Sequence, residues 1–258
     1  MKKKLQDNLT VTPKQIDIIL LLYRFRFLTT YHLQKLLHHN NPRTIQIWMK
    51  DLKEKKYVYS DYSRHEAREN TKSAVYTLLP KAREILKTLK DCSASVLKRL
   101  YKEKNRSQIF VEHCLLVAHI YLILLSQVTE NTQLHFSTQT DLTGYDYFPK
   151  PLPDAYISIK ESNKTKRYFL LLLDYNKPIR VLEAYVQKYL DYSETNEWVK
   201  HTNNAHFPSF LIVCPSQYIQ KKIMAYISNG FPIESFYLTT KETIRTKGIK
   251  PEIWQKVE

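Results

Sequence analysis

Residues 40–62 read NNPRTIQIWMKDLKEKKYVYSDY, a stretch that contains a turn, a whole helix and the beginning of a strand. Asn40-Asn41-Pro42 predicts a turn that caps a helix over about Arg43–Lys55, because Asn caps helix N-termini and Pro is favoured in the first turn. The side chains predicted to pack inward are Ile45, Trp48, Met49 and Leu52. Those predicted on the opposite face are Arg43, Gln46, Ile47, Lys50 and Glu54. The stretch therefore predicts an amphipathic helix with a basic outer face.

Two shorter helices are predicted before this one. Thr12-Pro13 opens the first, since Thr is a good N-cap and Pro suits the first helical position, and apolar residues follow at helical spacing. Thr29-Thr30 opens the second, which carries a short stripe of leucines. Two short helices, a tight turn and a basic third helix fit a helix-turn-helix. The alternative is an ordinary three-helix packing unit with a solvated basic face.

The segment after the third helix favours the helix-turn-helix. Tyr57–Tyr62 and Ser73–Leu79 are rich in aromatic and β-branched residues and predict two strands. The polar and basic residues between them predict a hairpin with a charged tip, and Leu79-Pro80 then opens a helix over Lys81–Leu89. This order is that of a winged helix, which we place at residues 1–90.

The candidate DNA contacts lie on the third helix and at the hairpin tip. An arginine can bond a guanine edge in two places and a glutamine can do so with adenine, whereas a wing tip contacts phosphates or the minor groove. The predicted contacts are Arg43, Thr44, Gln46, Lys50 and Lys53 on the helix and Arg64, Arg68 and Lys72 in the tip.

Charge is distributed unevenly along the 258 residues, whose formal net charge is +15. Residues 1–107 hold 24 Lys and Arg against 10 Asp and Glu, and residues 108–258 hold 16 against 15. A basic part joined to a neutral part predicts a polyanion-binding module on a neutral partner domain, with double-stranded DNA as the partner. The alternative is charge that only keeps the surface solvated.

Cysteine use and hydropathy point to a cytoplasmic protein without a membrane partner. Cys92, Cys114 and Cys214 are odd in number and far apart, which favours a reducing compartment. The first ten residues lack the apolar core of a signal peptide. The longest apolar stretch, Cys114–Leu125, is shorter than the roughly 20 residues that span a bilayer.

Residues 91–107 are highly charged and predict a linker to a second domain at 108–258. Helices are predicted at Gln108–Val128, Ile179–Glu197 and Gln217–Ser228, and strands at Gln133–Ser137, Pro153–Ile159, Arg167–Asp174, Phe207–Cys214 and Ser235–Thr240. The run Tyr168–Leu173 does not alternate, so it predicts a central strand buried on both faces. The fold class is therefore α/β, α+β over the whole chain, with a sheet covered by helices.

Asp154 and Asp174 lie at predicted strand ends, where an α/β sheet forms metal or substrate sites. The alternative is that each carboxylate only caps a local turn. Motifs for nucleotide binding and zinc binding are not found in the sequence. The three glycines, Gly144, Gly230 and Gly248, form no phosphate loop, and the Cys and His residues lack the paired spacing of a zinc site. No cofactor is expected, apart from Mg²⁺ in one of the functions considered below.

Several short segments resemble the replication-relaxation family, which is associated with plasmids and other mobile elements. They are Tyr76–Leu86, Glu112–Leu116, Leu152–Ala155, Phe169–Asp174, Lys188–Tyr192, Leu238–Thr240 and Trp254. The resemblance implies an N-terminal winged helix and a C-terminal domain similar to restriction endonucleases.

In that nuclease superfamily, acidic residues hold Mg²⁺ and a lysine helps to activate water. The resemblance implies Asp154 and Asp174 as metal ligands and catalytic residues, with Lys188 as a displaced catalytic lysine and Glu112 as a further carboxylate. Leu172 stands where the motif has an acid, and leucine cannot bind a metal. The resemblance therefore implies a degenerate nuclease-like domain that serves binding or dimerisation.

The leading hypothesis is a sequence-specific accessory or regulatory protein that binds duplex DNA in plasmid or mobile-element replication or DNA relaxation. Its expected partners are DNA, a second copy of the chain, and replication or mobilisation proteins. One alternative is a Mg²⁺-dependent DNA endonuclease or nickase, although an enzyme is the less favoured reading. The other is a dimeric winged-helix transcriptional repressor.

Overall fold

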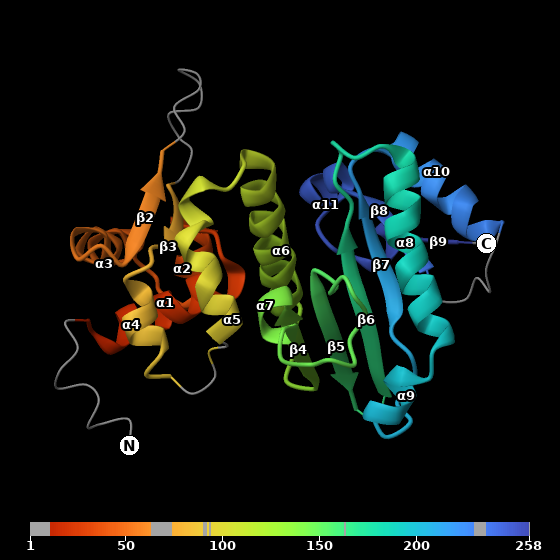
Figure 1. Cartoon of the computed structure of the whole chain (residues 1–258), viewed down its shortest axis with the longest axis horizontal. Coiled ribbons are helices and arrows are strands. Elements are labelled where there is room, and N and C mark those ends of the chain that lie inside the picture. The colour runs from red at the N-terminus through yellow and green to blue at the C-terminus, as the bar shows by residue number, and fades with distance from the viewer. Residues whose placement is uncertain are drawn as a thin grey trace. The chain divides into compact units, whose positions relative to one another are not determined.

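The computed structural model describes residues 11–62, 74–89, 92, 94–162, 164–229 and 236–257. Internal contacts divide the chain into two compact units, Met1–Leu122 and Ile123–Glu258. Figure 1 shows the first unit in red to yellow-green and the second in green to blue. The first unit contains a three-stranded sheet and the second a six-stranded sheet, so the chain is of the mixed α/β class that the sequence predicts.

The first unit is a winged helix-turn-helix. Its elements are α1 (Pro13–Phe25), β1 (Leu28–Thr29), α2 (Thr30–Leu36), α3 (Pro42–Glu54), β2 (Val58–Asp61), β3 (Val75–Leu78) and α4 (Ala82–Leu86). The three strands form an antiparallel sheet in the order β1-β3-β2. The predicted order of three helices, a hairpin and a helix is confirmed, although α4 ends at Leu86 and is shorter than predicted.

The first two helices begin at the threonines that the sequence indicates. Thr12 caps α1 in a capping box with Gln15, and Thr29 caps α2 in a box with His32. His32 is buried, and its pKa is lowered to about 4, first by burial and then by the nearby His119. The His32 and His119 ring centroids are 6.4 Å apart. The start of α2 therefore depends on a neutral, buried histidine.

The charged segment that we predicted as a linker at 91–107 differs from that prediction over residues 94–105. It forms α5 (Ala94–Leu97) and two 3-10 turns, η3 (Lys98–Tyr101) and η4 (Glu103–Asn105). Glu103 is only 1% exposed, and its carboxylate lies 2.7 Å from the Arg26 guanidinium and 3.7 Å from that of Arg99. A buried carboxylate is tolerated because it is paired twice. Apolar Val96, Leu97 and Leu100 are buried beside it.

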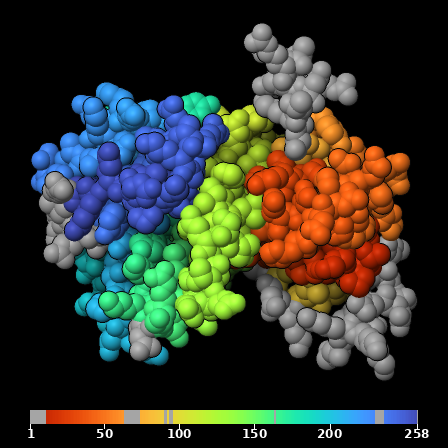
Figure 2. All heavy atoms as spheres, turned by 180° about the vertical axis from the view of Figure 1, so that it is seen from behind, coloured from red at the N-terminus to blue at the C-terminus, as the bar shows by residue number. Residues whose placement is uncertain are grey.

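The helix α6 (Gln108–Ser126) is more apolar than the sequence analysis implied. It is long and apolar enough to cross a membrane by length and composition alone, with a mean hydropathy of 2.0 and 33% of that window buried, so the shorter stretch Cys114–Leu125 understated it. Within the first unit, Tyr121 stacks on Phe25 at the end of α1 at 5.5 Å, and Phe110 meets Phe27, which lies between α1 and β1, at 6.2 Å. Five side chains near the middle of α6 are buried, namely Cys114, Leu116, Val117, Ala118 and Ile120, and atoms of this yellow-green segment are visible at the surface in Figure 2.

The second unit is a six-stranded mixed sheet with helices. Its strands are β4 (Thr132–Thr138), β5 (Ala155–Glu161), β6 (Lys164–Leu172), β7 (Ser209–Cys214), β8 (Phe236–Thr240) and β9 (Gln255–Lys256), in the order β4-β5-β6-β7-β8-β9. Its helical elements are α7 (Gln139–Leu142), α8 (Ile179–Glu194), α9 (Glu197–His201), α10 (Gln217–Ser228), α11 (Lys241–Lys247) and the turn η5 (Pro251–Ile253). Strands β6, β7 and β8 are parallel, and the other pairs are antiparallel.

A hydrophobic core lies between α8, α10 and one face of this sheet (Figure 1). Phe169, Phe210 and Trp198 are fully buried there, as is Tyr189 of α8. Strand β6 lies in the sheet interior with Leu170–Leu173 buried, which confirms the predicted central strand. The likeness of this unit to a restriction endonuclease stays a prediction.

Candidate nucleic-acid interface

The helix α3 is held in place by its apolar face and by one polar link to α1. Ile45, Met49 and Leu52 are fully buried. The Asp51 carboxylate accepts a hydrogen bond from the Gln15 amide at 2.5 Å and pairs with Lys55 at 2.7 Å. The hydrogen bond from Lys55, and then that from Gln15, hold the pKa of Asp51 below its usual value. The opposite face of α3 is therefore presented in a defined orientation.

The outer face of α3 carries the side chains that sequence analysis assigned to DNA. Arg43, Gln46, Lys50 and Lys53 are exposed, and Thr44 is half-buried. Ile47, also on this face, is 61% exposed, an apolar group that suits a thymine methyl. Lys50 pairs with Glu54 only at 4.0 Å and in solvent, so the pair contributes little. The face therefore offers hydrogen-bond donors, positive charge and one apolar contact.

A groove of about 620 Å³ runs beside this face, between α2, α3 and the β2–β3 hairpin. Its walls include Gln46, Lys50 and Lys53 of α3. The Lys53 ammonium lies 5.6 Å from the ring centroid of Tyr62, which follows β2. This cation–π contact keeps a positive charge at the groove between α3 and the hairpin.

Three residues that line the groove were not among the DNA contacts predicted from the sequence. Tyr31 and Gln34 of α2 and Tyr62 line the groove, and the two tyrosines are 49% and 58% exposed. Lys35 lies 5.8 Å from the Tyr31 ring. The sequence signal that could have identified these groove residues was the presence of tyrosines on both sides of the basic helix. The predicted contacts Arg64, Arg68 and Lys72 at the hairpin tip lie outside the described residues.

The residues predicted to form a metal site in the second unit are two aspartates at one end of the sheet and a lysine on α8. Asp154 precedes β5 and is 9% exposed, and its carboxylate accepts a hydrogen bond from the Leu172 amide at 2.7 Å. Asp174 follows β6 and accepts a hydrogen bond from the Asn176 amide at 2.9 Å. Because β5 and β6 are antiparallel, both aspartates lie at the same end of the sheet. Lys188 of α8 is exposed to solvent.

These residues do not fit a nuclease metal site. Each aspartate already accepts a backbone amide, and Leu172 supplies no oxygen at the second acidic position. Within the described ranges, no group of three or more His, Cys, Asp or Glu could hold a metal ion. The hydrogen bonds of Asp154 and Asp174 to local amides are those expected of the alternative interpretation, and the metal site stays a prediction.

A buried tyrosine pair faces Asp154, which sequence analysis did not find among 19 tyrosines. The hydroxyls of Tyr185 and Tyr189 on α8 lie 3.0 Å apart. Burial raises the pKa of both, and the negative charge of Asp154 raises both further. A raised pKa keeps both hydroxyls protonated at neutral pH, and either one can donate the hydrogen bond between them.

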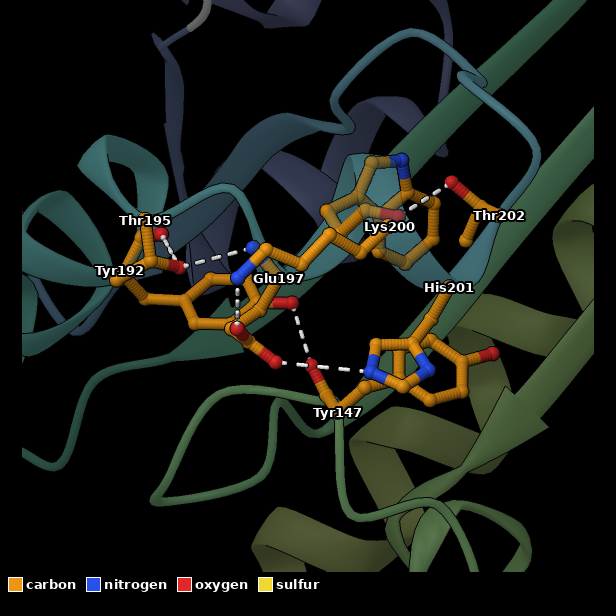
Figure 3. Close-up of polar contacts among 8 residues, drawn as sticks. Tyr147, Tyr192, Thr195, Glu197, Lys200, His201 and Thr202 are labelled. Carbon is orange, nitrogen blue, oxygen red and sulfur yellow. Dashed lines mark hydrogen bonds and ion pairs between the residues drawn. The ribbon is translucent and has the colours of Figure 1, made fainter.

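A second polar cluster surrounds the α8–α9 junction (Figure 3). The Tyr192 hydroxyl donates to the Tyr147 carbonyl at 2.5 Å, and the Tyr147 ring stacks on His201 at 5.1 Å. Glu197 pairs with Lys200 at 2.9 Å and with His201 at 3.6 Å. Burial, and then the charge of Glu197, raise the pKa of Tyr192 to about 12. This cluster joins the end of α8, the helix α9 and the segment that carries Tyr147.

Comparison with known proteins identifies the family. The model of the replication-relaxation family matches residues 20–207, which is more than half of the chain. The chain belongs to the replication-relaxation family. The match covers α3 with its basic face and extends through β6 and α8, and membership fits a replication-associated DNA-binding role.

Structural and curated comparisons add little to this membership. A solved structure of a double mutant of ZitR from Lactococcus lactis is similar at 19% identity, with a TM-score of 0.27, over 47% of this replication-relaxation protein and 77% of ZitR. A TM-score that low does not establish a shared fold. A search of curated proteins finds no match to this chain.

Proposed function

We propose that this replication-relaxation protein binds duplex DNA with sequence specificity and acts as an accessory or regulatory protein of replication or DNA relaxation in a plasmid or mobile element. It works in the compartment that holds this DNA, which we predict to be the cytoplasm. The observation that carries the proposal is the outer face of α3, where Arg43, Gln46 and Lys50 project from a helix whose other face is buried.

The chemistry of that face supports base reading in the major groove. Arg43 lies in the first turn of α3, and N-terminal residues of a recognition helix contact base edges. Gln46 lies one turn further and suits adenine, while Lys50 and Lys53 suit phosphates. The β2–β3 hairpin would then follow the adjacent backbone.

For the second unit we propose a binding role, either between two copies of the chain or with a replication or mobilisation protein. The engaged carboxylates of Asp154 and Asp174 support this role over Mg²⁺-dependent cleavage. No catalytic step is assigned to Asp154, Asp174 or Lys188.

The test begins with selection of binding sites from random duplex DNA by the full chain, followed by titration of the selected site. Arg43→Ala should weaken specific binding by about 1–3 kcal/mol and relax the preference at one base pair. Lys50→Ala should weaken binding to all sequences and reduce the salt slope by about 1. The matched control is Lys87→Ala with Lys98→Ala, two exposed lysines of the same unit outside α2, α3 and β2.

Selection that enriches no sequence, or an Arg43→Ala/Lys50→Ala variant that binds as the control does, would remove α3 from the interface. A palindromic site with half-sites one or two helical turns apart would favour a dimeric repressor over an accessory protein. Incubation of supercoiled plasmid with Mg²⁺ tests the nickase alternative, since open circles that disappear in Asp154→Ala would establish cleavage.

A further inference from the structure

A pocket of about 670 Å³ lies in the second unit, on the sheet face opposite the α8–α10 core. Its floor is formed by side chains that alternate with the core residues along neighbouring strands. Ile157 of β5 pairs with Tyr168 of β6, and Leu211 of β7 pairs with Tyr237 of β8. The pocket therefore has a flat floor of two aromatic and two aliphatic side chains, and its volume lies within the range of ligand sites.

The walls come from two segments far apart in the sequence. Leu124 and Gln127 stand at the end of α6, and Ile249 and Trp254 lie on the segment that follows α11. The Gln127 side-chain amide donates to the Ile249 carbonyl at 2.5 Å and ties the two walls together. Tyr168, Tyr237 and Trp254 are all half-buried, so their rings remain accessible to a ligand.

The rim of the pocket is basic although the second unit is almost neutral. Exposed Lys166 and Lys250 line it, together with His206, and Glu161 is its acidic member among the lining residues. Exposed Lys164 lies on the same face of the β5–β6 hairpin as Lys166, whereas Arg167 alternates to the other face and interacts with Tyr156. From residue 108 onward the chain has 16 basic and 15 acidic residues, so this is a local concentration of positive charge. Such a rim is complementary to phosphate groups.

We propose that this pocket binds single-stranded DNA, with an unstacked base held against Tyr168 and Trp254 and the flanking phosphates held by Lys166 and Lys250. Aromatic platforms bordered by basic side chains are how proteins bind single strands without sequence preference. The recessed aromatic floor disfavours duplex DNA, whose bases are stacked on one another and present only their edges. The inference goes beyond the duplex binding proposed for α3, because it gives the second unit a nucleic-acid ligand of its own.

The test uses the full chain and a labelled oligothymidylate of about 12 nucleotides, followed by fluorescence anisotropy. Trp254→Ala should raise the Kd roughly 5- to 150-fold, the range for loss of one stacked base. Lys166→Glu with Lys250→Glu should raise the Kd and lower the salt slope by about 1.4, which is two phosphates on a single strand. The matched control is Lys221→Glu with Lys222→Glu, the same charge change on exposed residues of α10, with no comparable loss expected.

The lysine variants keep the test valid should Trp254→Ala fold poorly, because exposed lysines support no core. A Kd that moves equally in the lysine pair and the α10 control would overturn the proposal. So would displacement of the oligonucleotide by thymidine monophosphate at equal affinity, which would assign the pocket to a free nucleotide. Duplex binding is measured on the same variants and should not change, so failure here and failure of the α3 interface are separately visible.

Discussion

Protonation of His32 should destabilise the first unit as the pH falls below about 6.5. The pKa of His32 is 6.5 in an unfolded chain and about 4 in the folded one, so the unfolded state binds more protons between these two values. The free energy of unfolding therefore decreases as the pH falls through that window and is fully retained above it. The loss is about 2 kcal/mol at pH 5 relative to pH 7. The main cause is burial of the His32 ring, and the second is the nearby His119. Protonation would also cost the ring nitrogen the hydrogen bond that it accepts from the Thr29 amide at 3.3 Å.

The variant that isolates this effect is His32→Gln, because glutamine completes a capping box with Thr29 but does not titrate. Urea unfolding is measured at several pH values between 4.5 and 7, with amide hydrogen exchange of α2 peptides to report on the first unit. The wild-type chain should lose about 2 kcal/mol more than His32→Gln between pH 7 and pH 5. His119→Gln should give an intermediate loss, since it removes only the second cause of the shift. Equal losses in the wild type and His32→Gln would refute the reasoning.

Two further changes test packing and the sheet end. Glu103→Ala should destabilise the first unit by about 3–5 kcal/mol in urea unfolding, because Arg26 and Arg99 remain buried without their carboxylate. Replacement of the exposed Glu54 by alanine is the control and should have little effect. A small effect of Glu103→Ala would mean that the ion-pair network is not buried in solution. Asp154→Ala should lower the free energy of unfolding of the second unit by about 1–3 kcal/mol, because the Leu172 amide loses its acceptor. Asp154→Asn should lower it less, because the asparagine carbonyl oxygen can accept the same hydrogen bond. Equal decreases in the two variants would contradict the assigned contact.

The winged helix was predictable because its local signals agree with its tertiary packing. Thr12, Thr29 and Asn41 cap their helices as the sequence indicates, and the apolar stripe of α3 matches its buried face. A linker was predicted over residues 94–105 because charged residues are dense there, whereas the structure has helical turns whose apolar residues are buried. Arg99 stands four residues before Glu103 and was a local signal for an ion pair, but Arg26 precedes Glu103 by 77 residues, and no local pattern shows that pairing.

The second unit was predictable in its strands and not in its sites. The apolar run that contains Leu170–Leu172 indicated the central strand because burial on both faces removes alternation. Asp154 and Asp174 do lie at one end of the sheet, as strand-end positions suggested, but their hydrogen bonds to local amides depend on backbone geometry. The pocket beside Tyr168 and Trp254 joins segments far apart in sequence, so spacing alone could not reveal it.

The strand pairing of the sheet separates the two units in time. All strand pairs of the first unit lie between residues 28 and 78, whereas the sheet of the second unit begins at Thr132 and is completed only when β9 pairs with β8 through Gln255 and Lys256. Non-local parallel pairing is slow to form, and domains generally fold as they leave the ribosome. We therefore expect the first unit, with the basic face of α3 already in place, to be folded while the sheet of the second unit is still being synthesised.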